Sequence, residues 1–106
     1  MTLSIILPVY NVASFIGPCL ASVFNQLADV NAEVILVDDC CTDDSIAQAT
    51  KVIGQDPHFR IVRHGQNRGL SAARNTGIAS ATGDYVLFID SDDVLADGCL
   101  ATLVSL

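Results

Sequence analysis

Short apolar runs alternate along the chain with segments in which apolar residues recur at every third or fourth position. The apolar runs occupy residues 3–10, 33–39, 59–64 and 84–90. They are nearly continuous, which is typical of strands covered on both faces of a sheet. The periodic segments occupy residues 12–27, 42–53, 70–80 and 95–106 and predict amphipathic helices. Strands and helices alternating at this spacing predict βαβ units, so we expect an α/β fold, a three-layer sandwich around a mostly parallel sheet.

Residues with known preferences for helix ends suggest where the helices begin and stop. Ser14 is expected to cap the first helix, which places Pro18 in the first turn, where a backbone N–H has no helical partner. Asp43 and Asp44 are expected at the positive end of the second helix, and Gly54 is expected to terminate it. These positions divide the chain into strand–helix pairs with no linker or internal repeat between them.

The composition is that of a folded domain rather than of a disordered segment. Hydrophobic residues make up 51% of the 106 residues, so there is enough apolar material for a core. This length corresponds to a single domain, residues 1–106. The formal net charge of −7 would repel nucleic-acid phosphates and argues against a DNA- or RNA-binding module. It leaves room for a phosphate ligand that arrives with a divalent cation.

The cysteines show no pattern of a metal or redox site. They are Cys19, Cys40, Cys41 and Cys99, with no C-x-x-C pair and no zinc spacing to a histidine. The adjacent pair could form a redox site, but such residues more often act as small apolar fillers. The first basic residue is Lys51, so no signal peptide is visible, and the apolar run at residues 3–9 is too short to span a bilayer. We therefore expect a reduced, cytoplasmic setting.

Polar residues gather where the predicted strands end. These residues are Tyr10, Asn11, Asp38, Asp39, His64, Asp90 and Asp92. In open parallel sheets, ligands bind beyond the carboxyl ends of the strands. Because the residues come from separate parts of the chain, their convergence on one edge is more informative than any single motif.

The densest acidic cluster follows the fourth apolar run, in the sequence YVLFIDSDD. Because side chains alternate between the faces of a strand, Asp90 and Asp92 are expected to point to one side and Ser91 to the other. Two carboxylates beyond a rigid strand form an oxygen site of the kind that Mg²⁺ or Mn²⁺ prefers. The alternative is structural, with Asp92 or Asp93 capping the last helix.

The second apolar run also ends in a carboxylate pair, Asp38 and Asp39. One of them can brace the loop while the other accepts hydrogen bonds from a nucleobase or ribose. Arg68 and Arg74 flank the start of the third helix, where an arginine could grip a diphosphate or pair with the acidic edge. The tract GQNRG at residues 65–69 lacks the spacing of glycine-rich phosphate loops, so a metal bridge to phosphate fits better.

Several segments resemble, in order, the motifs of the family 2 glycosyltransferases. They are SIILPVYN, FIGPCLASVFNQ, EVILVDDCCTDDS and NRGLSAARNTGIASATGDYVLFIDSDD, and they span residues 4–93. The resemblance implies the GT-A fold, in which a Rossmann-like half is joined to an acceptor half. It also implies transfer of a sugar from a nucleotide-diphosphate donor to an acceptor hydroxyl, with inversion at the anomeric carbon. The family most often uses UDP-sugars, so the resemblance favours a UDP-sugar as the donor.

The resemblance assigns residues of this chain to the donor site. These are Pro8, Val9, Tyr10, Asp39, Arg74, Asp90 and Ser91. The first three would line the nucleobase pocket, and Asp39 would accept a hydrogen bond from the base. Asp92 is the expected direct ligand of Mn²⁺ or Mg²⁺, with Asp90 as the second carboxylate, nearer the ribose. Arg74 would stand near the diphosphate.

Two departures from the family pattern affect what is expected. Cys40 and Cys41 stand where the family usually has a small Gly or Ser before the dipeptide TD, which bears on loop flexibility. The chain also stops in an apolar helical pattern, whereas the family's general base lies well beyond the D-x-D pair. We therefore expect the donor-binding half of a glycosyltransferase, cut short at its C-terminus, with its catalytic base unassigned.

Partners follow from the same resemblance. The expected acceptor is a saccharide or a lipid-linked molecule, which is compatible with a peripheral position at the inner membrane face. In a shortened chain the fourth strand would expose an apolar edge, so self-association is expected. Two alternatives remain: a non-catalytic nucleotide-binding fragment, and a receiver-like phosphoacceptor domain. A receiver would carry an acidic pair after the first strand and an aspartate after the third, where this chain has Tyr10-Asn11 and His64.

Overall fold

Strands and helices alternate along the chain as the apolar pattern predicts. The computed structural model describes residues 2–28 and 30–105. Its elements are β1 (Leu3–Val9), α1 (Ala13–Phe24), β2 (Ala32–Asp38), α2 (Ser45–Ile53), β3 (Phe59–Arg63), α3 (Leu70–Ser80), β4 (Tyr85–Phe88) and α4 (Cys99–Val104). In this described part, no helix combines the length and the apolar character needed to cross a membrane.

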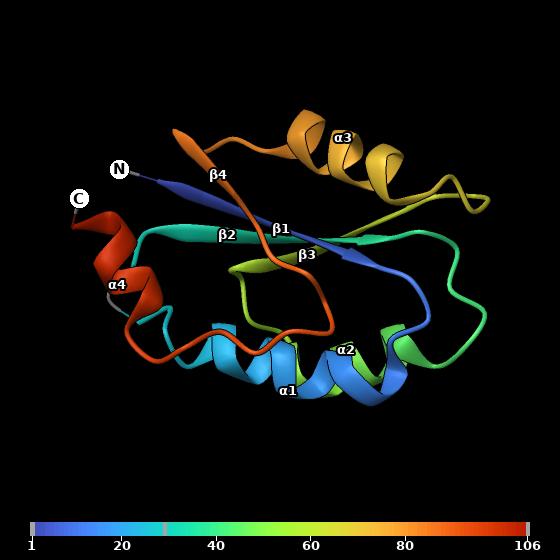
Figure 1. The fold of residues 1–106 in the computed structure, drawn as a ribbon, viewed down its shortest axis with the longest axis horizontal. Coiled ribbons are helices and arrows are strands. Elements are labelled where there is room, and N and C mark those ends of the chain that lie inside the picture. Colours follow the sequence, from blue (N-terminus) through green and yellow to red (C-terminus); the bar gives the residue numbers. More distant parts are fainter. Residues whose placement is uncertain (1, 29, 106) are drawn as a thin grey trace.

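The four strands found in the described residues form one parallel sheet in the order β3-β2-β1-β4. Figure 1 shows the sheet as the middle layer, with α3 over one face and α1 and α2 over the other. The expected three-layer α/β sandwich is therefore confirmed. The chain moves from β1 to β3 through helices on one face, and then α3 carries it back across the other face to β4. The strand order thus reverses between β1 and β4, where their carboxyl ends leave a crevice.

The two faces of the sheet are sorted by the alternation of side chains along β1 and β2. Ile5 and Leu7 pack with Val34 and Leu36 toward α1, α2 and α4, in the larger core cluster. Ile6 packs with residues of β2 and with α3 in a smaller cluster. Because both faces are covered, each strand reads as a continuous apolar run rather than an alternating one.

Small residues allow α3 to lie close to the sheet. Ala73 is buried, and a Cβ added to Gly77 would overlap the side chain of Ile6 on β1. The helix backbone therefore approaches the strand directly at Gly77. This close approach seats α3 on the sheet, and its amino end lies beside the crevice between β1 and β4.

The start of α1 differs from the prediction. The helix begins at Ala13 without a cap from Ser14, and Pro18 lies inside it rather than in its first turn. The free N–H groups at this end are satisfied by residues at the start of α2: Val12 donates to Ser45 Oγ at 2.8 Å, and Ala13 donates to Asp43 Oδ2 at 3.2 Å. A cap supplied from 30 residues away replaces the local serine.

The second helix follows the prediction more closely. Gly54 terminates α2 with a φ of 53°, a conformation that glycine adopts without strain. At its amino end, Asp43 Oδ1 accepts a hydrogen bond from the backbone N–H of Ser45 at 3.0 Å. Hydrogen bonds from Ser45 and Ala13 hold the pKa of Asp43 below its usual value. Asp43 therefore serves the first turns of both α1 and α2.

The last helix is shorter than the predicted segment 95–106. It begins at Cys99, and backbone groups of the preceding residues bond to side chains on α1 and just after it. The Gln26 side chain donates to the carbonyl of Ala96 at 2.8 Å and accepts from the N–H of Leu100 at 3.0 Å. Leu100 is fully buried, so the helix is anchored in the larger core cluster. Leu106 lies outside the described residues.

Candidate functional site

A cavity of about 470 Å³ lies at the crevice between the carboxyl ends of β1 and β4. It is lined by Pro8, Val9, Tyr10, Val12, Asp39, Asn67, Gly69, Leu70, Ala73, Asp90, Ser91 and Asp92. Residues from three strand ends and from the amino end of α3 therefore share one concave surface. Every residue that the sequence assigned to the donor or metal site lines this cavity except Arg74.

Tyr10 forms an exposed wall of the cavity. Tyr10 is the first residue after β1, and it is 46% exposed. The chain then turns at Asn11, which adopts a left-handed φ of 51°. The Asn11 amide donates to Thr42 Oγ1 at 3.0 Å and accepts from the Thr42 N–H at 2.9 Å. This reciprocal pair joins the loops after β1 and β2, which holds Tyr10 at the rim.

The two carboxylates at the end of β2 have different environments. Asp38 Oδ1 accepts the N–H of Cys41 at 3.0 Å and braces the loop. Asp39 is 3% exposed and lies on the cavity wall. The sequence predicted that one member of the pair would brace the loop, and the structure identifies Asp38 as that member.

Asp39 is held by three hydrogen bonds to its carboxylate. Oδ1 accepts from the N–H of Arg68 at 2.8 Å and contacts His64 Nδ1 at 2.7 Å, while Oδ2 accepts from the N–H of Gly69 at 2.9 Å. Burial raises the pKa of Asp39, but the hydrogen bonds from His64 and from these backbone N–H groups outweigh burial and lower the pKa. The carboxylate therefore stays ionised at neutral pH, and it orders the loop that leads into α3.

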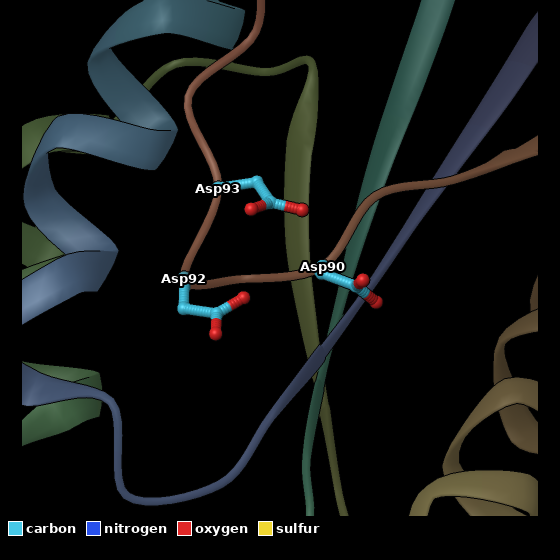
Figure 2. Close-up of side chains that lie close together, drawn as sticks. All are labelled: Asp90, Asp92 and Asp93. Atoms are coloured by element: carbon cyan, nitrogen blue, oxygen red, sulfur yellow. The ribbon is translucent and has the colours of Figure 1, made fainter.

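Asp90, Asp92 and Asp93 form an exposed carboxylate cluster beyond β4 (Figure 2). Each offers one oxygen, and these three oxygens lie within 4.8 Å of one another. Like charges at this separation repel, and a divalent cation would relieve the repulsion. Oxygen ligands from carboxylates, with open positions for water and phosphate, suit Mg²⁺ or Mn²⁺. The residues therefore fit a metal ion.

The local geometry of the cluster corrects part of the prediction. β4 ends at Phe88, and the acidic residues lie on a turn in which the Asp93 N–H donates to the Asp90 carbonyl at 3.0 Å. Asp90 and Asp92 are exposed while Ser91 is 6% exposed, as expected, but a turn rather than strand alternation produces this arrangement. Neither Asp92 nor Asp93 caps α4, because that helix starts after Gly98.

Arg74 lies beside the cluster and not on the cavity wall. Its Nη2 is 3.7 Å from Asp90 Oδ1, and its Cζ is 5.6 Å from the centre of the Phe88 ring. An ion pair and a cation–π contact thus hold the guanidinium over the end of β4. Of the two roles that the sequence left open, these contacts correspond to pairing with the acidic edge.

The four cysteines are free thiols. Burial, together with the nearby charges of Asp93, Asp92 and Asp90, raises the pKa of Cys19 to about 11. Burial also raises the pKa of Cys41 to about 11. Thiols in this state are neutral at pH 7 and poor nucleophiles. Cys19 and Cys41 therefore behave as small apolar fillers, which is the interpretation that the sequence analysis favoured over a redox site.

Two polar residues next to the cavity were not recognised as important from the sequence. His64 follows β3 and contacts Asp39, and its Nε2 lies 2.7 Å from Thr76 Oγ1 on α3. From the sequence, His64 was predicted only to lie at a strand end, and no role was predicted for Thr76. A threonine six residues into a predicted helix carries no local signal, because its partner lies 12 residues away. Asp93 was likewise assigned only as a possible cap.

Comparison with known proteins agrees with this geometry. The sequence model described as Glycosyl transferase family 2 matches residues 4–106. An uncharacterized glycosyltransferase of Haemophilus influenzae is 41% identical over 95 residues, which cover 90% of this chain and 38% of that protein. This chain therefore spans well under half of the length of that relative.

Solved structures of the GT-A type share the fold. The crystal structure of Staphylococcus aureus TarS 1-349 in complex with UDP-GlcNAc superposes with a TM-score of 0.90 at 31% identity, covering 99% of this chain and 30% of that one. The mannosyltransferase PcManGT from Pyrobaculum calidifontis, in complex with GDP-Man and Mn²⁺, gives a TM-score of 0.86 at 30% identity, covering 96% and 31%. The parallel sheet, the cavity at its reversal point and the match over residues 4–106 lead to one conclusion: the chain belongs to glycosyl transferase family 2.

Proposed function

We propose that this chain forms the nucleotide-sugar-binding part of a glycosyltransferase that moves a sugar from a nucleotide-diphosphate donor to an acceptor hydroxyl. The observation that carries the proposal is the carboxylate cluster of Asp90, Asp92 and Asp93 beside a cavity that also contains Asp39 and Tyr10. A cation at the cluster could meet a diphosphate while the base lies deeper in the cavity. The relatives of known structure that were solved in complex with UDP-GlcNAc and with GDP-Man support this class of donor.

The cavity divides into a base-binding part and a phosphate-binding part. We assign Pro8, Val9 and Tyr10 to the wall against the nucleobase, since the exposed ring of Tyr10 offers a flat apolar surface. Asp39 is the acceptor for an N–H of the base. A UDP-sugar is the donor that we favour, because the related TarS structure was solved in complex with UDP-GlcNAc.

The phosphate-binding part lies at the turn beyond β4. We assign Asp92 as the direct ligand of Mn²⁺ or Mg²⁺ and Asp90 as a second carboxylate near the ribose, with the Ser91 backbone between them on the cavity wall. A bound divalent cation would supply Lewis-acid stabilisation for the charge that develops on the leaving diphosphate. Arg74 pairs with Asp90 in the structure, and we propose that it stays close enough to the turn to add positive charge near the diphosphate.

Inverting transfer also needs a base that removes the proton from the acceptor hydroxyl. We assign no residue among the described ones to this role. The acceptor is proposed to be a saccharide or a lipid-linked molecule, and the setting to be cytoplasmic at the inner membrane face. The exposed edge of β4, with Tyr85 60% exposed and Phe88 41% exposed, is the proposed contact for self-association.

A second candidate is a nucleotide-binding chain without turnover. It uses the same cavity and differs only in the absence of a catalytic base. The family assignment removes the receiver-like alternative, since the matched model covers residues 4–106. Nucleotide binding is therefore the property to test first.

Calorimetric titration with UDP tests the proposal, using Mn²⁺ in one series and a chelator in the other. The parent chain should bind UDP with Mn²⁺ and lose most of the affinity with chelator. Asp92→Ala should weaken binding about tenfold or more, because a charged ligand of the metal is removed. Asp97→Ala is the matched control, since Asp97 is exposed and lies outside the cluster. Equal UDP affinity for Asp92→Ala and the parent in Mn²⁺ would show that the metal assignment is wrong.

A further inference from the structure

A buried chain of hydrogen bonds runs from the cavity wall into α3. Asp39 Oδ1 lies 2.7 Å from His64 Nδ1, and His64 Nε2 lies 2.7 Å from Thr76 Oγ1. The side chains of His64 and Asp39 are each 4% exposed. These hydrogen bonds therefore link the carboxyl ends of β2 and β3 to the half-buried Thr76 in the middle of α3.

The direction of the first hydrogen bond follows from the chemistry of the groups. An ionised carboxylate only accepts hydrogen bonds, so His64 Nδ1 must carry the proton that points at Asp39. In the neutral ring, Nε2 then accepts from the Thr76 hydroxyl. This hydroxyl can rotate, so the link to Thr76 persists in either protonation state of the ring. His64 thus always donates to Asp39, and Thr76 fixes the plane of the ring.

The hydrogen bonds leave Asp39 with a single open position. Oδ1 already accepts from His64 and from the Arg68 N–H, which uses both of its lone pairs. Among the residues that the structure describes, Oδ2 accepts only from the Gly69 N–H. Because Asp39 lines the cavity, the remaining lone pair on Oδ2 is the one that a ligand can use. Without His64, two backbone N–H groups alone among the described residues would restrain the carboxylate, so this acceptor would be held less firmly in place.

We propose that His64, oriented by Thr76, is a positioning residue for nucleobase recognition: it locks Asp39 so that one carboxylate lone pair faces an N–H of the base. The inference rests on the proposed function, because it requires a base in the cavity. It adds His64, which follows β3, and Thr76 on α3 to a site whose proposed ligand contacts come from β1 and from the residues that follow β1, β2 and β4. A base without an N–H donor at that edge would lose the contact.

A matched pair of substitutions separates this role from general support of the fold. In His64→Asn the side-chain amide nitrogen lies where Nδ1 lies in histidine, so it can still donate to Asp39 but cannot reach Thr76. In His64→Gln the nitrogen lies where Nε2 lies, so it can meet Thr76 but leaves Asp39 Oδ1 without its donor. Both changes remove the ring and differ in which contact survives.

The experiment measures binding of UDP and of pyrophosphate, each with Mg²⁺, by calorimetry on the 106-residue chain. His64→Gln should bind UDP about tenfold more weakly than the parent, and His64→Asn should stay within about threefold. Pyrophosphate affinity should be unchanged in both variants, because this ligand has no base. Thermal melting of both variants establishes that they are folded at the temperature of the titration.

Each outcome supports or overturns the inference. Equal UDP affinities for the two variants, or a parallel loss of pyrophosphate binding, would overturn it while leaving the proposed function in place. A parent chain that binds pyrophosphate but not UDP would overturn the proposed function as well. If His64→Gln does not fold, Thr76→Val and Thr76→Ser replace the pair. Thr76→Val should then bind UDP about threefold more weakly than Thr76→Ser, and equal affinities would overturn the inference.

Discussion

The sheet carries carboxylates at both of its ends, and the two sites are built in opposite ways. Near the amino ends of the strands, Glu33 on β2 is surrounded by donors: Oε2 accepts from Ser4 Oγ at 2.6 Å and from the Thr82 N–H at 2.6 Å, and Oε1 pairs with Arg60 at 3.2 Å. At the carboxyl ends, the cluster of Asp90, Asp92 and Asp93 is exposed, and its ion pair to Arg74 spans 3.7 Å.

The comparison separates a carboxylate that stabilises the fold from carboxylates that remain available to a ligand. Burial raises the pKa of Glu33, but hydrogen bonds from Ser4 and Thr82 and the Arg60 charge outweigh it and lower the pKa to about 2. The Glu33 carboxylate is therefore occupied by contacts within the protein. It ties the segment between α3 and β4 to β2, and so helps to set where β4 and its acidic turn lie.

The largest expected effect is on stability at the Glu33 end. Glu33→Ala leaves Ser4, Thr82 and Arg60 without their acceptor and should lower the free energy of unfolding by about 2 kcal/mol. Urea denaturation followed by circular dichroism measures this loss. UDP affinity of the folded variant should stay near that of the parent. A variant that is as stable as the parent would contradict the assignment of Glu33 as a structural carboxylate.

The second prediction concerns acid sensitivity. The pKa of Glu33 is about 2 in the folded chain against an ordinary value of 4.5, so its ionised form favours folding. This contribution is present above pH 4.5 and is lost as the pH falls toward 2. Glu33→Gln should therefore flatten part of the drop in stability between these pH values. Parallel stability profiles of the parent and the variant would contradict the prediction.

The smallest expected effect lies at the other end of the sheet. Asp93→Asn removes one of three mutually repelling charges, so the melting temperature without metal should rise by about 1 °C. Adding Mg²⁺ should stabilise the parent more than the variant, because the variant offers fewer ionised ligands. Differential scanning fluorimetry with and without Mg²⁺ provides the measurement. A loss of stability comparable to that of Glu33→Ala would mean that the cluster is structural.

The fold was predictable because its main determinants are local. Continuous apolar runs marked β1 and β2, and the three- and four-residue spacing marked α1 and α3. The gathering of Asp39, Asp90 and Asp92 around one cavity also followed from a general property of parallel sheets, since their strands end at a common edge.

The features that the sequence did not reveal depend on partners far along the chain. Ser14 looked like a cap, but Asp43 and Ser45 satisfy the start of α1. The segment before α4 looked helical, but Gln26 takes up its backbone groups. Neither interaction has a signature in the local pattern, because a side chain that bonds to distant backbone looks the same in sequence as one in water.

The site was predicted less completely than the fold for the same reason. Asp39 and the D-x-D pair stand at strand ends, where position alone suggests function. The support that His64 and Thr76 give to Asp39 joins residues 25 and 12 positions apart and becomes visible only in the folded chain. Local pattern thus locates a site, while its supporting contacts have to be read from the structure.

Paramagnetic broadening by Mn²⁺ in the amide NMR spectrum of the labelled chain tests the contrast between the two acidic ends most directly. Substoichiometric Mn²⁺ should broaden the signals of Asp90, Asp92 and Asp93 first, because the carboxylates of these three residues form the proposed cation site. The signals of Ser4 and Glu33, at the opposite end of the sheet, should stay sharp. Broadening that is centred on Glu33, or that is spread evenly over the exposed carboxylates, would contradict the assignment of the turn beyond β4 as the metal site.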